Sequence, residues 1–218
     1  MNIGLLGGSF NPVHNAHLRI ADGAKRACGL ERIIFIPAAD PPHKILAGDV
    51  SFDQRAQMVR LAIAGHGDYE LSSIEAERGG KSYSIDTIRG FRDRCPDSEL
   101  FFIIGGDSFL DIGSWHRYPD IFASCNLIVV ERPGHPLADP FDHLPEAVKN
   151  CFTAAMDGTG CLWHESGHGI YFITGAPLEL SSTEIRRRAA GGMDITRLVP
   201  MDVAAYISHQ RIYHQCLQ

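Results

Sequence analysis

The chain has 218 residues, a length that suits one well-buried α/β domain or such a domain with a modest insertion. Its 20 basic and 26 acidic residues give a formal net charge of −6, which argues against a general nucleic-acid-binding surface. The longest strongly apolar runs, such as residues 127–130, are far too short to cross a bilayer. We therefore expect no nucleic-acid or membrane partner, and any polyanion must bind at a local site.

The cysteines indicate the redox environment. All six are scattered, with no Cys-x-x-Cys pair, at positions 28, 95, 125, 151, 161 and 216. Because no signal-peptide pattern accompanies them, we expect reduced thiols in a cytoplasmic protein.

Short continuous apolar runs recur along the chain, with helical patterns between them. Runs of four or five apolar residues without polar alternation are typical of strands covered on both faces, as in a parallel sheet. The predicted strands are residues 3–6, 33–36, 100–104, 127–130 and 170–173, with an additional strand at 69–74. Helices are predicted at 17–28, from a capping-box pattern at Ser51 through Met58, Leu61 and Ala62, from Ser84, and from Ser181.

This alternation predicts an α/β fold with a doubly wound, mainly parallel, Rossmann-like sheet. In such folds ligands bind beyond the carboxyl ends of the strands. Segments 7–17, 37–44 and 105–107 each follow a predicted strand, so we expect them to gather at one site. We expect a single domain over residues 1–218, with an irregular excursion at about 131–168 that is rich in Pro, Gly and His.

The first candidate site follows the first strand. Gly7 and Gly8 have no Cβ atoms that would hold a phosphate away from their main-chain N–H groups. Ser9 follows them, and His14 and His17 come next. The helix that begins near His17 adds the positive end of its dipole. The segment is neither a Walker A loop nor a dinucleotide fingerprint. We interpret it as a phosphate-binding turn with two imidazoles, against the alternative of ordinary turn chemistry beside surface histidines.

A second candidate anion site lies near the other end of the sequence. Ser181 and Glu184 have capping-box spacing, which predicts the start of a helix. Its first N–H groups, the hydroxyls of Ser182 and Thr183, and the Arg186 guanidinium would then share one end and suit a phosphate. The alternative is an ordinary capped helix with a solvated arginine face, and a second phosphate segment at the same sheet edge favours the anion site.

Together these segments resemble a known superfamily. Residues 8–17, Gly-Ser-Phe-Asn-Pro-Val-His-Asn-Ala-His, are similar to the GxFxPxHxGH signature of the HxGH-type nucleotidyltransferases, and residues 181–186 resemble their late Ser-Ser-Thr-x-Ile-Arg motif. Within that superfamily the chain looks most like the bacterial nicotinate-nucleotide adenylyltransferases, over roughly residues 1–214. Further matching segments are 41–44 (Pro-Pro-His-Lys), Arg55 with Met58, 77–83 with Asp86 and Thr87, 104–107, Trp115 and 132–134. The chain departs from the signature at Ala16, where the superfamily has Gly.

The resemblance implies that ATP and nicotinate mononucleotide give deamido-NAD and pyrophosphate, a step of NAD biosynthesis. The attacking phosphate is already ionised, so catalysis consists of aligning two polyanions and neutralising charge. The implied catalytic residues are His14, His17 and Arg186. The implied ATP-binding residues are Gly8, Ser9, Phe10, His14, His17, Asp107, Ser182, Thr183 and Arg186. The implied nicotinate mononucleotide-binding residues are Ser9, Lys44, Thr87, Trp115 and His116. Mg²⁺ is expected to bind mainly through the ATP phosphates, without protein ligands.

Two of these residues have structural alternatives. Asp107 could cap the helix that follows it instead of accepting from the adenosine ribose hydroxyls. Trp115 could be a buried core residue instead of stacking on the pyridine ring.

Other functions stay open at this stage. The chain could be another HxGH-type adenylyltransferase, such as pantetheine-phosphate adenylyltransferase, or a nucleotide-binding module that does not turn over. The letters from His164 to His168 match the His-Glu-x-x-His motif of zinc hydrolases, but Gly167 and the strand at 170–173 argue against the required helix. Cys151, Cys161 and His143 are a further candidate for an incidental metal site. The expected partners are ATP and nicotinate mononucleotide, and a homo-oligomer stays an open alternative.

Overall fold

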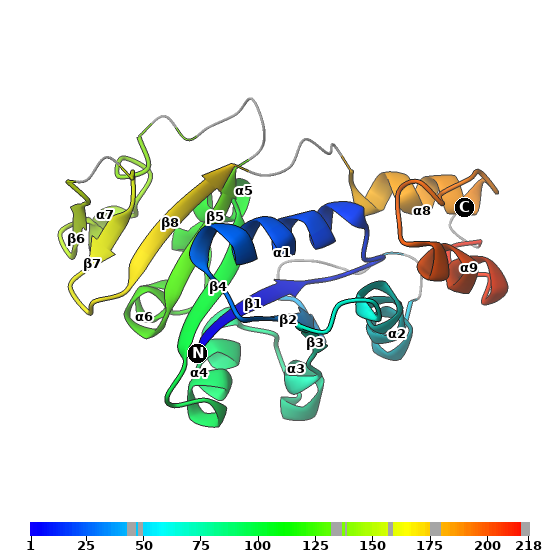
Figure 1. Ribbon diagram of the computed structural model, residues 1–218, viewed down its shortest axis with the longest axis horizontal. Helices are drawn as coiled ribbons and strands as arrows, with labels where there is room; N and C mark the ends of the chain where they lie inside the picture. The colour runs from blue at the N-terminus through cyan, green and yellow to red at the C-terminus, as the bar shows by residue number, and fades with distance from the viewer. Residues whose placement is uncertain are drawn as a thin grey trace. The chain divides into compact units, whose positions relative to one another are not determined.

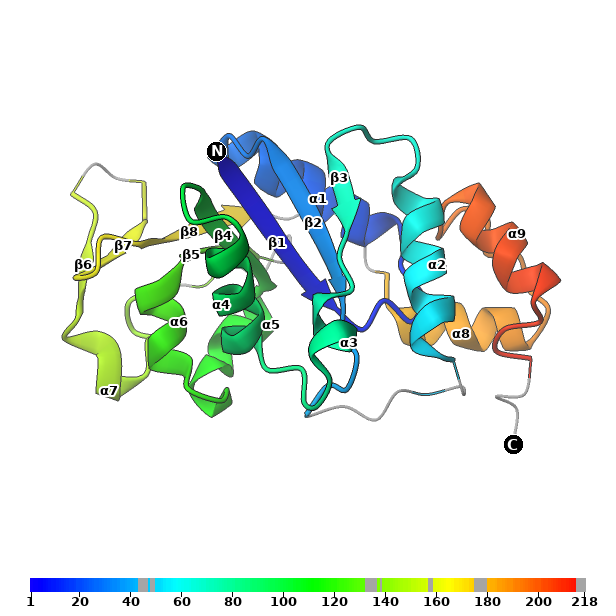
Figure 2. The same cartoon turned by 90° about the horizontal axis from the view of Figure 1, so that it is seen from below.

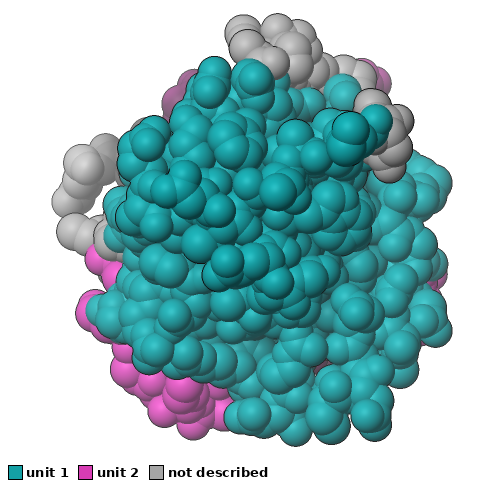
Figure 3. All heavy atoms as spheres, turned by 90° about the vertical axis from the view of Figure 1, so that its left-hand side faces the viewer, with its two compact units in different colours: residues 1–7, 20–33, 83–177 teal, residues 8–19, 34–82, 178–218 magenta. Residues whose placement is uncertain are grey.

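The computed structural model describes residues 1–42, 47, 50–131, 137, 139–156, 159–174 and 180–214. The chain divides into two compact units built from interleaved segments (Figure 3). Unit 1 comprises residues 1–7, 20–33 and 83–177, and unit 2 comprises residues 8–19, 34–82 and 178–218. The single domain over residues 1–218 stays a prediction.

The strands are β1 (Asn2–Gly8), β2 (Arg32–Pro37), β3 (Tyr69–Leu71), β4 (Glu99–Gly105), β5 (Asn126–Glu131), β6 (Phe152–Ala154), β7 (Leu162–His164) and β8 (Gly169–Thr174). They form one sheet in the order β3-β2-β1-β4-β5-β8-β7-β6 (Figure 1). The five main predicted strands all lie within observed strands, namely β1, β2, β4, β5 and β8. In unit 1, β4 pairs in parallel with β1 and β5, and β5 with β8, so the mainly parallel sheet is confirmed.

The helices of eight or more residues are α1 (Asn15–Cys28), α2 (Phe52–Ile63), α4 (Ser84–Arg94), α8 (Ser182–Ala190) and α9 (Met201–His209). The first four were predicted, and α1 begins two residues earlier than expected. At α2 the capping box forms completely, since the Ser51 hydroxyl accepts from the Gln54 N–H and the Gln54 side chain accepts from the Ser51 N–H. Within unit 2, α2 packs against α9 and β3 (Figure 2).

The remaining helices are short: α3 (Ile74–Arg78), α5 (Gly106–Leu110), the 3-10 turn η1 (Ile112–Ser114), α6 (Tyr118–Ser124) and α7 (Glu146–Lys149). The strand expected at 69–74 was partly wrong, because β3 ends at Leu71 and Ile74 begins α3. None of the helices in the described segments is long and apolar enough to span a membrane.

The segment at 131–168, expected to be an irregular excursion, includes some short regular elements. Among its described residues it contains α7 and an antiparallel pair, β6 with β7, which extends the sheet by pairing with β8. Each added strand has three residues, too few for an alternation of side chains to be read from the sequence. Their stability comes from strand pairing, β6 with β7 and β7 with β8, instead of from their own pattern.

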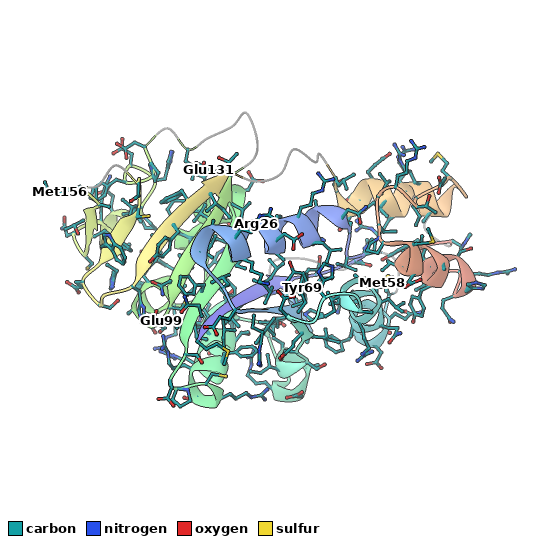
Figure 4. The ribbon with its side chains drawn as sticks, in the orientation of Figure 1. Arg26, Met58, Tyr69, Glu99, Glu131 and Met156 are labelled. Atoms are coloured by element: carbon teal, nitrogen blue, oxygen red, sulfur yellow. The ribbon has the colours of Figure 1, made fainter. Side chains whose placement is uncertain are left out.

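One buried polar side chain ties the strands of unit 1 together. Asn126, at the start of β5, donates to the Glu99 carboxylate of β4 at 2.9 Å and accepts from the Gly169 N–H of β8 at 2.8 Å. Glu99 lies at the lower end of the sheet in the view of Figure 4. Both ends of the amide are therefore satisfied, as a buried polar group requires.

Candidate active site

The two predicted anion-binding segments meet in unit 2. Arg186 Nη1 of α8 donates to the Asn11 carbonyl at 2.8 Å, and the Ser182 hydroxyl donates to the Pro12 carbonyl at 3.1 Å. These partners are 175 and 170 residues apart in the sequence. We call residues 8–17 and 181–186, joined by these bonds, the anion cluster.

The turn after β1 is shaped by Phe10. Its side chain is fully buried, its φ is 43°, and its ring lies 5.0 Å from the His17 ring and 5.8 Å from the Phe35 ring. A Cβ at Gly8 would approach the Phe10 ring to 3.2 Å, so the close fit of ring and main chain favours glycine there. Phe10 therefore supports the turn with its side chain, and only its main chain could reach a phosphate.

The two histidines stand at the entrance of α1 and stack on each other. Their ring centroids are 3.7 Å apart with 27° between the planes. The His14 main-chain N–H donates to His17 Nδ1 at 3.1 Å. Because Nδ1 of His17 accepts this bond, the proton of the neutral ring sits on Nε2, which becomes a hydrogen-bond donor.

His14 is buried, and its Nδ1 has no hydrogen-bond partner among the described residues. Burial lowers the pKa of His14 to about 4, because desolvation penalises the imidazolium. The ring is therefore uncharged at neutral pH. It can still donate an N–H hydrogen bond to an anion.

This burial predicts a pH-dependent stability. The unfolded chain protonates His14 as the pH falls through 6.5, but the native chain does so only near 4. The His14 contribution is thus complete above pH 6.5 and is lost progressively down to pH 4, by about 3 kcal/mol at most. Urea unfolding of wild type and His14→Gln at pH 7.5 to 4.5 should show the steeper loss in wild type. Parallel curves would contradict the assignment, and His209→Gln, an exposed site, is the control.

Ala16 departs from the superfamily signature without disturbing the cluster. It lies in the first turn of α1, and it is not among the described non-glycine residues with positive φ. A helical position accepts a Cβ without strain, so alanine can replace glycine here.

At the α8 end of the cluster, hydrogen bonds fix the Arg186 guanidinium in place. Besides Asn11, Arg186 contacts the Thr183 hydroxyl, to which Nη2 donates at 3.0 Å. The Ser181 hydroxyl accepts from the Glu184 N–H, which confirms the predicted N-cap. A guanidinium held by two hydrogen bonds beside a helix N-terminus is well suited to binding phosphate.

The next two arginines are used differently. Arg187 and Arg188 both donate to the Glu184 carboxylate, at 2.7 to 2.8 Å. Their hydrogen bonds hold the pKa of Glu184 down to about 2. The Glu184 carboxylate is therefore bonded to arginines of its own helix. The second hydrogen bond of a capping box, from the Ser181 N–H to the Glu184 side chain, is not among the described hydrogen bonds.

The other predicted residues that the structure describes belong to unit 1. Asp107 lies in the first turn of α5, and the N-cap is Gly105, so the alternative that Asp107 caps this helix is wrong. Trp115 is only half-buried, with its ring 6.4 Å from Phe102 and edge-on to it, so the buried-core alternative is also wrong. Their ligand roles stay predictions.

Thr87 and His116 differ sharply in exposure. Thr87 is 1% exposed, and its hydroxyl donates to the Tyr83 carbonyl at 3.3 Å. His116 is exposed, and its ring lies 4.2 Å from that of Tyr83. Of these two, His116 is the side chain open to a ligand. Lys44 lies outside the described residues.

Arg55 was named in the sequence only as part of a matching segment, and its role in the site was not predicted. Its side chain is fully buried in unit 2, and Nη1 donates to the Ser9 carbonyl at 2.8 Å. Nε has no partner within the described part of the chain, and burial lowers the pKa of the guanidinium. A charged side chain on the apolar face of α2, in register with Met58 and Val59, was the available signal. Arg55 positions the turn that would hold the phosphate.

The zinc-hydrolase motif does not form its helix. β7 ends at His164, and residues 165–168 make the turn into β8, closed by the His164 N–H donating to the His168 carbonyl at 2.8 Å. The geometry that a His-Glu-x-x-His zinc site needs is therefore missing from this described segment, as the sequence indicated.

The fold is that of an α/β protein of the nucleotidyltransferase type. The model of the cytidylyltransferase-like family matches residues 5–188. A protein of Pelobacter propionicus named "Probable nicotinate-nucleotide adenylyltransferase" is 58% identical over 99% of this chain and 100% of its own length. A protein of the same name from Geobacter metallireducens is 51% identical over 98% of each chain. The chain therefore belongs to the cytidylyltransferase-like family and, within it, to the nicotinate-nucleotide adenylyltransferases.

Solved structures agree on the fold. Plasmodium falciparum nicotinic acid mononucleotide adenylyltransferase complexed with NaAD superposes with a TM-score of 0.75 at 19% identity, covering 100% of this chain and 99% of that one. The same enzyme complexed with APC gives a TM-score of 0.73. These structures confirm the predicted nucleotidyltransferase fold. The relatives at 58% and 51% identity confirm the predicted enzyme class.

Proposed function

We propose that the chain transfers the AMP moiety of ATP to nicotinate mononucleotide, which gives deamido-NAD and pyrophosphate. The observation that carries the proposal is the anion cluster, in which Arg186 and Ser182 of α8 are bonded to Asn11 and Pro12 of the turn after β1. Membership of the nicotinate-nucleotide adenylyltransferases supports the choice of acceptor.

The proposed reaction needs charge neutralisation more than proton transfer. A phosphate oxygen of nicotinate mononucleotide forms a bond to the α-phosphorus of ATP, and the bond to the bridging oxygen breaks as pyrophosphate leaves. His14 and His17 would donate N–H groups near the α-phosphate, where charge develops. Arg186 and Thr183 would hold the β- and γ-phosphates, with N–H groups of Gly8 and Ser9 completing the cradle.

The remaining assignments follow the family resemblance. Phe10 and Ser182 would contribute to the ATP site, and Asp107 would accept hydrogen bonds from the adenosine ribose. Nicotinate mononucleotide would contact Ser9, Lys44, Trp115, His116 and the main chain around Thr87, whose own side chain is buried. The half-buried indole of Trp115 suits stacking on the pyridine ring.

Mg²⁺ fits this cluster as an ion carried by the nucleotide. Residues 8–17 contain no carboxylate, and Glu184, the one carboxylate of residues 181–186, is bonded to Arg187 and Arg188. Phosphate oxygens and water would therefore supply the ligands, which suits an ion that gives up its water reluctantly. Bound in this way, Mg²⁺ would neutralise charge on the phosphates.

The acceptor specificity tests this function. Pyrophosphate release should be fast with nicotinate mononucleotide and much slower with nicotinamide mononucleotide, because the site is proposed to read the carboxylate. Equal rates for the two would contradict the proposed acceptor. Release with 4′-phosphopantetheine instead would favour the sister adenylyltransferase, and no release with any acceptor would favour a binding module without turnover.

We also propose that the enzyme works in the cytoplasm. The five cysteines in the described part of the chain are free, which supports a reducing compartment. Homo-oligomer formation stays a prediction, which light scattering of the purified protein would test.

A further inference from the structure

A cluster of metal-ligating side chains lies in the hairpin of β6 and β7, outside the proposed function. Cys151, His164 and Glu165 each offer one ligand atom, and these atoms all lie within 4.8 Å of one another. The strand pairing builds this proximity, because Phe152 is opposite His164 and the Glu165 N–H donates to the Cys151 carbonyl at 2.9 Å. The three residues are thus brought together by the backbone register.

The His164 ring is held in a fixed orientation. It lies edge-on to the Phe152 ring at 4.9 Å and parallel to the Phe122 ring at 6.5 Å. The Ser166 main-chain N–H donates to Nδ1 at 3.1 Å and the Ser166 hydroxyl lies 2.8 Å from the same nitrogen, which leaves Nε2 as the nitrogen for a ligand. Metal binding at Nε2 requires the ring proton to move to Nδ1, where it displaces the bond from the Ser166 N–H and donates to the Ser166 hydroxyl. Such an outer partner on the second nitrogen is usual for metal-bound histidine.

The other two ligands lie close together, with the Cys151 sulfur within 4.8 Å of a Glu165 carboxylate oxygen. A cation bound between them would be attracted by the carboxylate and would favour the thiolate form of Cys151. Sulfur and carboxylate are therefore placed so that one ion could bind both.

We propose that Cys151, His164 and Glu165 bind one divalent ion of the zinc class, with water as the fourth ligand. Thiolate and imidazole favour Zn²⁺ over Mg²⁺ or Ca²⁺, which prefer oxygen. On binding, the Cys151 S–H bond breaks, a sulfur–metal bond forms, and the proton passes to solvent. The site differs from the motif suspected in the sequence: Glu165 is a ligand, Cys151 takes the place of His168, and neither Cys161 nor His143 belongs to the group.

Cobalt provides the direct test, because Co²⁺ replaces Zn²⁺ and reports its ligands. The full chain, stripped with EDTA, should bind one Co²⁺ with a thiolate-to-cobalt charge-transfer band and tetrahedral visible bands, and Zn²⁺ should abolish both. Cys151→Ser should lose the charge-transfer band, whereas Cys161→Ser, a half-buried thiol at the other end of the hairpin, should keep it. Absence of the band in wild type, or its persistence in Cys151→Ser, would overturn the proposal.

Two further measurements separate the site from catalysis and from incidental binding. Ser166→Ala should weaken Co²⁺ binding by roughly 10-fold to 100-fold, the usual loss for an outer partner. Zn²⁺ should raise the Tm of wild type but not of Cys151→Ser, since only the native site binds it. Adenylyltransferase activity should be the same in Cys151→Ser and wild type. Equal affinity in Ser166→Ala, or an equal Tm rise in Cys151→Ser, would contradict the proposed geometry.

Discussion

His17→Ala is expected to lower kcat by roughly two to four orders of magnitude, the range for losing a preorganised transition-state donor or a positioned catalytic side chain. The expectation depends on the tautomer of His17. Its Nδ1 accepts from the His14 N–H, so Nε2 carries the proton that would face the α-phosphate. Pyrophosphate release at saturating substrate measures the effect.

The fold should survive this change, because His17 is only half-buried on the first turn of α1. The unfolding curve of His17→Ala should stay close to wild type. His209→Ala, which removes an exposed histidine of α9, should turn over like wild type. Wild-type kcat in a folded His17→Ala variant would remove His17 from the mechanism.

Much of the fold could be predicted because the main strands are continuous apolar runs. All residues of 100–104 and 127–130 are buried, so their apolar sequences alone indicate strands covered on both faces. The predicted helix starts at Ser51, Ser84 and Ser181 needed only local spacing. β6 and β7 escaped prediction because three-residue strands depend on β8, which follows them in the sequence.

The residues of the site likewise divide into those that short sequence segments reveal and those that depend on partners far along the chain. The glycines, the histidine pair and the α8 residues carry their chemistry in short segments, and these segments proved to be bonded together. Arg55 and Tyr213 act on partners 46 and 202 residues away, Ser9 and Asn11, and no spacing rule connects them. The His17 tautomer likewise depends on a main-chain N–H, which leaves no trace in a sequence.

The hydrogen-bond geometry of the site leads to a second prediction, at Arg186. Arg186→Lys is expected to lower kcat/KM for ATP by about 10²-fold, although the charge is kept. The guanidinium binds Asn11 and Thr183 with two separate nitrogens, which fixes its plane before ATP arrives. Lysine cannot reproduce that fork, so its ammonium would have to be positioned at the moment of binding.

The neighbouring arginine supplies a matched control. Arg187→Lys changes the same functional group on the same helix, but Arg187 is exposed and bonded to Glu184. It should therefore keep kcat/KM within about twofold, since exposed ion pairs contribute little. If the two variants lost activity equally, general positive charge near α8 would explain ATP binding. A loss confined to Arg186→Lys would show that the bond between α8 and the turn after β1 orients the triphosphate.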